Sequence, residues 1–259
     1  MNEVEISRRI KSEVFGKLIR VYDAVDSTNL RAIELIKGGE EEGTLVIAEE
    51  QTAGRGRRGK AWFSEKGKNL LFSLIIKPCI NRDSLSLTSL TAALSVAKAV
   101  QTLYGLPVEC KWPNDVMADS KKFCGILPET VLREGDHPGI SLGIGINVNQ
   151  KKFPAEIAER TVSLSMLTGK ELDRYELLAE VLQHLENNFR RLGEGYKREI
   201  LDEWIRFSFH FGREVSINVD GQVINGIAED VAEDGSLIIR SKDEKIKIIS
   251  GDVSYDTRI

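Results

Sequence analysis

The sequence predicts an α/β fold, in which a mixed sheet with a few helices precedes a small all-β module at the C-terminal end. Two observations carry this prediction. Up to about residue 207, short apolar runs typical of buried strands are interrupted by a few helical patterns. After about residue 209, apolar residues alternate at period two, and Asp-Gly pairs separate the runs as in hairpins. We therefore expect two domains, residues 1–208 and 209–259.

The elements of the first domain follow from local signals. Ser27, Thr28 and Asn29 include good helix caps, and the amphipathic helix after them should end at Gly38 or Gly39. Strands are expected in the apolar runs 44–50, 69–77, 108–112, 122–132 and 140–148, with a turn at 119–120 before the fourth. Helices are expected at 85–105, which is mostly apolar all round and therefore buried, and within 173–207.

The second domain should be a small barrel of about 50 residues. Its runs 213–219, 222–231, 236–240 and 245–250 alternate apolar and polar residues, and hairpin turns are expected at 220–221 and 234–235.

Composition excludes several classes of protein. The chain has 259 residues and a net charge of −4, from 36 Lys and Arg against 40 Asp and Glu, which argues against a surface that grips nucleic acid throughout. Its three cysteines and three histidines are scattered without metal-binding spacing, as in a reducing compartment. We find no signal peptide and no apolar run of the roughly 20 residues that a membrane span needs.

The strongest local signal is the segment 54–60, Gly-Arg-Gly-Arg-Arg-Gly-Lys, in which four of seven residues are basic and three are glycine. Glycines let the backbone approach a ligand closely, and exposed N–H groups can cradle an anion. The spacing of Gly54 and Lys60 fits a P-loop, but Ala61 stands where Ser or Thr should bind Mg²⁺. Taken alone, the segment is also consistent with a solvated basic loop or with an RNA-binding patch.

Three further motifs combine polar and apolar residues. Lys-Trp-Pro-Asn-Asp at 111–115 is unusual, although a strand end and a turn would explain it. The segment 121–127 opens with two lysines and then turns apolar, as a solvated strand end also would. In 143–149, small residues alternate with apolar ones, so one strand face is nearly bare for a ligand, another backbone or ordinary packing.

Together and in this order, these motifs closely resemble the biotin protein ligases. The resemblance rests on Asp-Ser-Thr-Asn at 26–29, the segment 49–64 around the basic loop, and the motifs at 111–115, 121–127 and 143–149. It extends over nearly the whole chain, because the small C-terminal β module also matches. It implies a class II synthetase-like mixed sheet with helices, followed by an SH3-like barrel.

The resemblance also implies a reaction in two steps. Biotin and MgATP first give biotinyl-5′-AMP and pyrophosphate, and a lysine of a carboxylase's biotin carboxyl carrier domain then attacks the mixed anhydride. We expect a cytoplasmic enzyme without a structural metal, and a homodimer, because family members often dimerise through the catalytic sheet. DNA is not expected as a partner, since only 25 residues precede Asp26, fewer than a three-helix DNA-binding module requires. A membrane is not expected either, because the chain has no apolar run long enough to span one.

The site residues that the resemblance implies fall into three groups. The catalytic group, with Lys122 beside the biotin carboxylate and the α-phosphate, is Lys122, Arg57 and Lys111. Biotin is expected to contact Ser27, Thr28, Asn29, Gln51, Gly54, Arg55, Gly56, Arg57, Trp62, Lys122, Gly125, Ile126 and Leu127. ATP and the adenylate are expected to contact Arg55, Arg57, Arg58, Lys60, Trp62, Lys111, Asn114, Asn147 and Asn149. Asp115 has two open roles, as a ligand of Mg²⁺ or as the residue that orients a lysine.

Two rival functions and one departure from the family pattern complete the sequence-based expectations. The nearest rival is a lipoate or octanoate ligase or transferase of the same fold, and a rival from another class is a non-catalytic biotin sensor or RNA-binding module. Pro128 stands where family members commonly have Val, and because proline lacks an N–H, we expect this strand position at an edge or a bulge.

Overall fold

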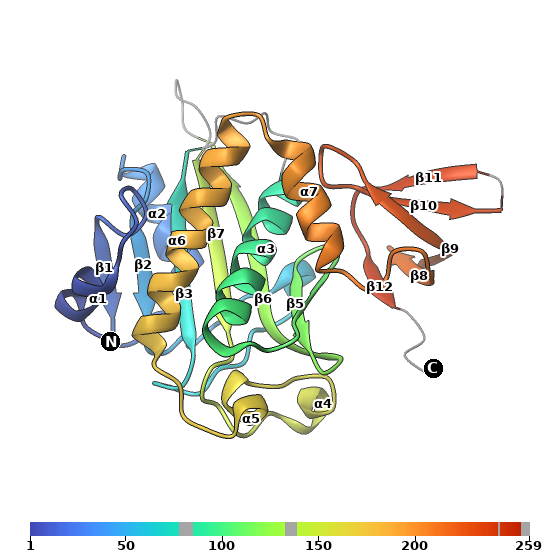
Figure 1. Ribbon diagram of the computed structural model, residues 1–259. Coiled ribbons are helices and arrows are strands. Elements are labelled where there is room, and N and C mark those ends of the chain that lie inside the picture. Colours follow the sequence, from blue (N-terminus) through green and yellow to red (C-terminus); the bar gives the residue numbers. More distant parts are fainter. Residues whose placement is uncertain (78–84, 133–138, 243, 255–259) are drawn as a thin grey trace.

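The chain folds around two sheets, which lie side by side in Figure 1. The computed structural model describes residues 1–77, 85–132, 139–242 and 244–254. Within these residues, a mixed seven-stranded sheet with helices on both faces precedes a five-stranded antiparallel sheet. The predicted α/β class with a C-terminal β module is confirmed.

The seven-stranded sheet has the strand order β1-β2-β3-β7-β6-β5-β4. Its strands are β1 (Ile19–Tyr22), β2 (Leu45–Ala48), β3 (Leu70–Ile76), β4 (Glu109–Lys111), β5 (Asp115–Ala118), β6 (Lys121–Val131) and β7 (Gly139–Ile146). Among the strands that the structure describes in this sheet, only β1 and β2 pair in parallel, and the other neighbours are antiparallel. Every residue of β3 is buried, as its position inside the sheet requires.

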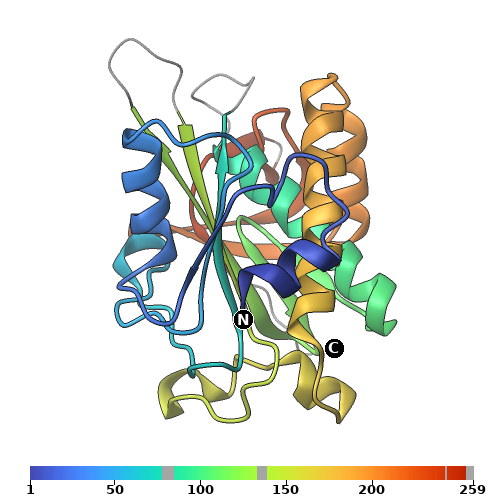
Figure 2. The same cartoon turned by 90° about the vertical axis from the view of Figure 1, so that its left-hand side faces the viewer.

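Helices cover the two faces of this sheet unequally (Figure 2). The helices are α1 (Glu3–Arg9), α2 (Thr28–Lys37), α3 (Leu85–Tyr104), α4 (Ala155–Ala158), α5 (Leu164–Thr168), α6 (Arg174–Gly193) and α7 (Lys197–Arg206). On one face, α2 packs its Ala32 and Ile36 against a small cluster that includes Val46 of β2 and Ile75 of β3. On the other face, α3 lies directly on the sheet, and α6 and α7 pack against α3.

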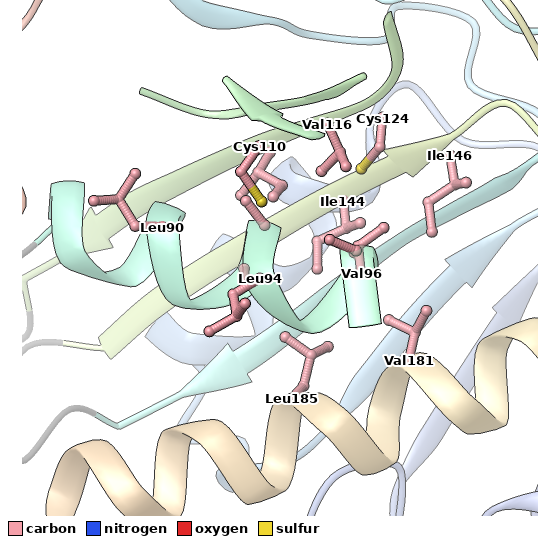
Figure 3. Packing of buried hydrophobic residues seen from close by; sticks show 14 of the residues in the cluster. Leu90, Leu94, Val96, Cys110, Val116, Cys124, Ile144, Ile146, Val181 and Leu185 are labelled. Atoms are coloured by element: carbon pink, nitrogen blue, oxygen red, sulfur yellow. The ribbon is translucent and has the colours of Figure 1, made fainter. Parts of the chain in front are cut away.

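The main core lies around α3, between the sheet and α6 (Figure 3). Figure 3 shows Leu94 and Val96 of α3 between Ile144 of β7 and Leu185 of α6. Each of these side chains is at most 2% exposed. The all-round apolar pattern of the sequence therefore predicted the burial of this helix correctly.

The free thiols of Cys110 and Cys124 belong to the same core and are fully buried. Burial raises the pKa of both thiols, so they stay protonated at neutral pH. The remaining cysteine, Cys79, and one of the histidines, His137, lie outside the described residues.

The C-terminal sheet has the order β11-β10-β9-β8-β12 and is antiparallel throughout. Its strands are β8 (Glu214–Val219), β9 (Gln222–Val231), β10 (Leu237–Ser241), β11 (Glu244–Ile248) and β12 (Asp252–Ser254). Asp220 and Gly221, both with positive φ, form the predicted turn between β8 and β9, and Gly235 lies in the second predicted turn. This sheet corresponds to the predicted small barrel.

Two details of the sequence-based expectation concern element boundaries. The helical pattern at 173–207 is interrupted, because α6 ends at Gly193 and α7 begins at Lys197, with Gly195 at a φ of 98° between them.

Pro128 lies in the part of β6 past Gly125, where β7 is the only neighbouring strand among the described residues. The predicted edge position of this proline is confirmed.

In the parts of the chain that the structure describes, no helix is both long enough and apolar enough to span a membrane.

Candidate active site

One pocket brings together five stretches of the chain that carry a sequence motif. It has a volume of about 710 Å³. The stretches that line it and that carry a sequence motif are 27–29, 51–63, 111–115, 122–127 and 143–147. The β-sheet explains this convergence, because residues 122–127 and 143–147 lie on the neighbouring strands β6 and β7.

The strand β7 gives the pocket a direction. Gly143, Gly145 and the following Asn147 alternate with buried Ile144 and Ile146, so these three face the pocket side of the sheet. At a rise of about 3.3 Å per residue, Gly143 and Asn147 lie about 13 Å apart along the strand. The site can therefore be described by its Gly143 end and its Asn147 end.

At the Gly143 end, Gln51 is oriented by the first turn of α2. Its Oε1 accepts hydrogen bonds from the Thr28 backbone N–H (2.8 Å) and from Thr28 Oγ1 (3.0 Å). The Nε2 of Gln51 lies 3.3 Å from where a Cβ would stand on Gly54. Because the oxygen is occupied, Gln51 offers two N–H donors, which suit a carbonyl acceptor such as a ureido group.

The same end contains a polar network below the pocket surface. Asn29 is 3% exposed, and its Oδ1 accepts from Ser73 Oγ (2.7 Å) and Ser141 Oγ (3.0 Å). Its Nδ2 donates to the Leu127 carbonyl (3.0 Å) and to Glu129 Oε2 (2.8 Å). All four hydrogen-bonding positions of the Asn29 amide are thus used within the protein, which fixes its orientation.

Glu129 joins this network to the basic loop, which consists of residues 54–60. Its Oε1 lies 3.0 Å from Arg55 Nη2, and its Oε2 accepts from Arg55 Nη1 at 3.2 Å. Arg55 itself stands in a short hairpin, in which it pairs with Ala61 and in which Trp62 N donates to the Gly54 carbonyl. The sequence-based reasoning did not find Glu129, because its partners lie 74 and 100 positions away.

Cationic side chains gather toward the other end. Lys122 Nζ lies 2.6 Å from Asp115 Oδ1 and 5.5 Å from the centre of the Trp62 ring. Arg57 Nη1 donates to Asn114 Oδ1 at 3.3 Å, and Asn114 Nδ2 donates to the Ile126 carbonyl at 2.8 Å.

Burial lowers the pKa of two cations in the pocket lining, Lys111 and Arg57. Desolvation lowers the pKa of Lys111, and the charge of Asp115 opposes that shift. Desolvation likewise lowers the pKa of Arg57, which Asp252 opposes. Since burial disfavours a positive charge, each of these side chains would gain from an anion in the pocket.

The C-terminal sheet contributes to the pocket as well. Asp252 of β12 lines it, and its Oδ2 accepts a hydrogen bond from Lys60 at 3.0 Å. Burial alone would raise the pKa of Asp252, but the hydrogen bond from Lys60 and the nearby arginines hold that pKa below its usual value. A second ion pair joins Arg58 to Asp220 at 3.3 Å. The basic loop therefore contacts both sheets.

Trp112 joins the motif at 111–115 to the C-terminal sheet. Its indole is 1% exposed, and its Nε1 donates to the Gly235 carbonyl in the β9–β10 turn at 3.0 Å. The side chain of Trp112 is thus a packing contact between the two sheets, on a segment whose neighbours Lys111 and Asn114 line the pocket.

Most of the residues that the sequence singled out line this pocket, and three do not. The residues outside its lining are Gly54, Arg58 and Asn149. Asn149 is turned toward Leu172, to whose carbonyl its Nδ2 donates and from whose N–H its Oδ1 accepts, both at 2.9 Å. The lining residues that sequence reasoning did not single out include Phe63, Met117, Phe153, Ile157, Arg160, Thr161 and Asp252.

The described residues contain no group of three or more His, Cys, Asp or Glu side chains that could hold a metal ion. Asp115 and Asp252, the two aspartates in the pocket lining, each already contact a lysine. Protein sites for Mg²⁺ commonly use one or two carboxylates together with substrate phosphates. The side chains present fit that mode of binding better than a dedicated protein site.

Two family models match the chain. The model of the biotin/lipoate A/B protein ligase family matches residues 21–147. The model of the biotin protein ligase C-terminal domain matches residues 210–255. The first match contains every motif of the pocket, and the second covers the five-stranded sheet.

Curated relatives and solved structures are similar over most of their length. A bifunctional ligase/repressor BirA of Bacillus subtilis is 32% identical over 98% of this chain and 78% of its own. A biotin--[acetyl-CoA-carboxylase] ligase of Mycobacterium tuberculosis is 30% identical over 91% of this chain and 89% of its own. The Aquifex aeolicus biotin protein ligase in complex with biotin and ATP has a TM-score of 0.81 and 33% identity, with 92% of this chain and 98% of the other covered.

Proposed function

The chain belongs to the biotin protein ligase family, and from this premise we propose how its pocket joins biotin to a protein. The enzyme is an ATP-dependent ligase that forms biotinyl-5′-AMP and transfers the biotinyl group to a lysine of an acceptor protein. A lipoate ligase of the same fold is the less well supported alternative, since the similar proteins named above are biotin ligases.

One observation carries the assignment of the site. A single pocket joins a donor-bearing amide, Gln51, at one end to half-buried cations, Arg57 and Lys111, toward the other. Biotin has the same polarity, with a ureido carbonyl at one end and a carboxylate at the other. We propose that biotin lies along β7 with its ureido ring near Gly143 and its carboxylate near Lys122.

In the first step, a biotin carboxylate oxygen attacks the α-phosphorus of ATP, and the bond to pyrophosphate breaks. Two anions must approach, so positive charge at the meeting point lowers the barrier. We propose Lys122 as the catalytic residue there, with Arg57 and Lys111 as further cations. The contact of Lys122 with Asp115 supports the role of Asp115 as the residue that orients this lysine.

In the second step, the ε-amine of the acceptor lysine attacks the carbonyl carbon of the mixed anhydride. The amine loses a proton, an amide bond forms, and AMP leaves with the bonding electron pair. Water would destroy the adenylate by the same attack, so the site must exclude it. We propose that the basic loop covers the pocket. The ion pairs Arg55–Glu129 and Lys60–Asp252, which hold the loop in place, support this role.

Further proposals concern the substrates and surroundings of the enzyme. ATP would enter as its Mg²⁺ complex, with the metal held mainly by phosphates and supplying charge neutralisation when bound. The acceptor would be the biotin carboxyl carrier domain of a carboxylase, and the reaction would take place in the cytoplasm. We also propose a division into a catalytic domain, 1–208, and an SH3-like domain, 209–259.

We propose a homodimer that forms through the catalytic sheet. The open side of β6 past Ile126 offers strand edge for such a contact within the part of the chain that the structure describes. Sedimentation velocity tests it, since a dimer should sediment as a species of twice the monomer mass, and a monomer at all concentrations would contradict it.

ATP–pyrophosphate exchange tests the first step with the purified protein. Biotin should support the exchange, and lipoate or octanoate at equal concentration should not. Exchange that depends on lipoate rather than biotin would favour the alternative ligase. Absence of exchange with any of these acids would contradict an adenylating enzyme.

A further inference from the structure

The turn between β9 and β10 belongs to the C-terminal sheet, but it rests on a helix that packs on the seven-stranded sheet. Gly235 in this turn has a φ of 83°, a conformation that favours glycine. A methyl group on Gly235 would lie 2.5 Å from the backbone N of Leu87 and 2.7 Å from the carbonyl carbon of Ser86, both in the first turn of α3. The backbone of the turn therefore lies close against α3, and a side chain on Gly235 would push it away.

The same turn holds the side chain of Trp112. The carbonyl oxygen of Gly235 accepts a hydrogen bond of 3.0 Å from Trp112 Nε1, and Trp112 is 1% exposed. An indole has a single hydrogen-bond donor, and burying that donor without a partner costs free energy. The place of this carbonyl therefore sets the orientation of the indole.

The strand before Trp112 is attached to the chain that enters the C-terminal sheet. Cys110 of β4 donates its N–H to the Phe207 carbonyl at 2.8 Å, and its own carbonyl accepts from Ser208 Oγ at 2.7 Å. Residues 207–208 lie between α7 and β8, and they contact β4 on the side away from β5. The segment 110–112 is thus held along its outer side by this stretch and at its end by the β9–β10 turn.

Residues on either side of Trp112 reach the pocket. Lys111 and Asn114 line it, whereas Gly235 lies outside its lining. Asn114 Oδ1 also accepts a hydrogen bond from Arg57 Nη1 at 3.3 Å, so the place of Asn114 affects that guanidinium. Two of the three cations proposed for adenylation, Lys111 and Arg57, therefore depend on the segment that Trp112 anchors.

We propose that Trp112 and Gly235 are positioning residues, through which the C-terminal sheet fixes the place of Lys111 and Arg57 for adenylation. This inference rests on the proposed function, because it assigns those two cations to the first step. The β9–β10 turn acts from outside the pocket, in contrast to Asp252 of β12, which lines the pocket itself.

Gly235→Ala is the main test, because the changed residue lies outside the pocket lining. With alanine there, the turn must move by about 0.9 Å to bring the 2.5 Å approach to an ordinary separation of 3.4 Å. A misplacement of about 1 Å in a catalytic arrangement can reduce the rate about 100-fold. Since the shift reaches the cations only through Trp112, we expect kcat for ATP–pyrophosphate exchange to fall by about 5- to 50-fold. KM for biotin should stay within about threefold of wild type, because the Gly143 end of the pocket is not displaced.

Trp112→Phe tests the hydrogen bond itself. It keeps an aromatic ring in the buried space and removes the N–H that donates to the turn. We expect kcat to fall by about 3- to 30-fold, again with little change in KM for biotin. The variant that combines Trp112→Phe with Gly235→Ala should be no slower than the slower single variant, because both substitutions break the same link.

Gly221→Ala is the matched control. Gly221 lies in the β8–β9 turn of the same sheet with a φ of 92°, so alanine there is strained in the same way. A methyl group at this position meets nothing within 4 Å. The variant should lose stability in urea and keep wild-type kcat at a temperature where it is fully folded, which separates loss of position from loss of stability.

The outcomes separate this inference from the proposed function. In variants that are folded by circular dichroism, wild-type kcat in Gly235→Ala, a change confined to KM for biotin, or effects that multiply in the double variant would each overturn it. An equal loss of kcat in Gly221→Ala would overturn it too, since the loss would then follow stability. If Gly235→Ala does not fold, Trp112→Phe alone must lower kcat, and a wild-type kcat there overturns the inference. Lack of exchange by the wild-type protein would instead contradict the proposed function.

Discussion

Glu129→Gln is the substitution that tests the Gly143 end of the pocket most selectively. Glu129 contacts Arg55 through both carboxylate oxygens and accepts a hydrogen bond from Asn29. Glutamine keeps one oxygen that can still accept from Asn29, but it cannot pair with a guanidinium charge. The substitution should therefore release Arg55 and leave the buried network of Asn29 intact.

The magnitude follows from the exposure of the pair. The Arg55 side chain is 41% exposed and that of Glu129 is 24% exposed, so solvent screens the ion pair considerably. We assign the loss about 0.5–1.5 kcal/mol, between an exposed ion pair and a charge-assisted hydrogen bond. Because about 1.4 kcal/mol corresponds to a factor of ten, KM for biotin should rise about two- to tenfold.

Steady-state ATP–pyrophosphate exchange measures this effect. KM for biotin should rise while KM for ATP and kcat stay within about twofold, because Glu129 lies at the end of the pocket away from Lys122. Asp220→Asn is the matched control, since it removes the carboxylate from Arg58, which lies outside the pocket lining. An increase in KM for ATP without one for biotin would refute this reading of the site.

Three further predictions concern catalysis, the contact between the sheets and acid stability. Lys122→Ala and Arg57→Ala should each reduce biotinyl-5′-AMP formation about 100- to 1000-fold without loss of circular dichroism, and wild-type rates would contradict the assignment. Trp112→Phe removes the buried hydrogen bond to Gly235 and should lower the free energy of unfolding in urea by about 1–3 kcal/mol. A loss below about 0.5 kcal/mol would show that this bond contributes little. Burial, and then the charge of Lys111, lower the pKa of His210 to about 4, so the folded state keeps this imidazole neutral. The unfolded chain binds a proton below about pH 6.5, so His210 should remove up to about 3 kcal/mol of stability as pH falls from about 6.5 to 4. Urea titrations at both ends of this range should show a smaller difference for His210→Gln, and an equal difference would contradict the assignment.

The sequence predicted the fold best where a pattern was long or strongly apolar. Helix α3 is mostly apolar and strand β3 is apolar except for Ser73, and both were expected close to where they lie. Strands β1 and β5 were missed, because each has only four residues and borders polar turns. Asp119 and Ser120, both with positive φ, form the turn that the sequence indicated, but only pairing with β6 makes the preceding residues a strand.

The site was predictable in composition and not in its internal contacts. The motifs could be identified because each is compact in sequence, and the sheet brings them together. The partners of the basic loop could not, since Lys60 and Asp252 are 192 residues apart and meet only when both sheets are in place. Nor does a glycine in a strand pattern tell which side chain will cover it, as the indole of Trp62 does at Gly145.

Transfer of biotin to an acceptor tests the central claim most directly. The protein is incubated with ATP, biotin and a biotin carboxyl carrier domain, and mass spectrometry then locates the modification. We predict one biotinyl group on one lysine of the carrier, formed with an equal amount of AMP, and none when ATP or biotin is omitted. A carrier that stays unmodified with both substrates present, or that accepts lipoate in place of biotin, would contradict the function assigned to this pocket.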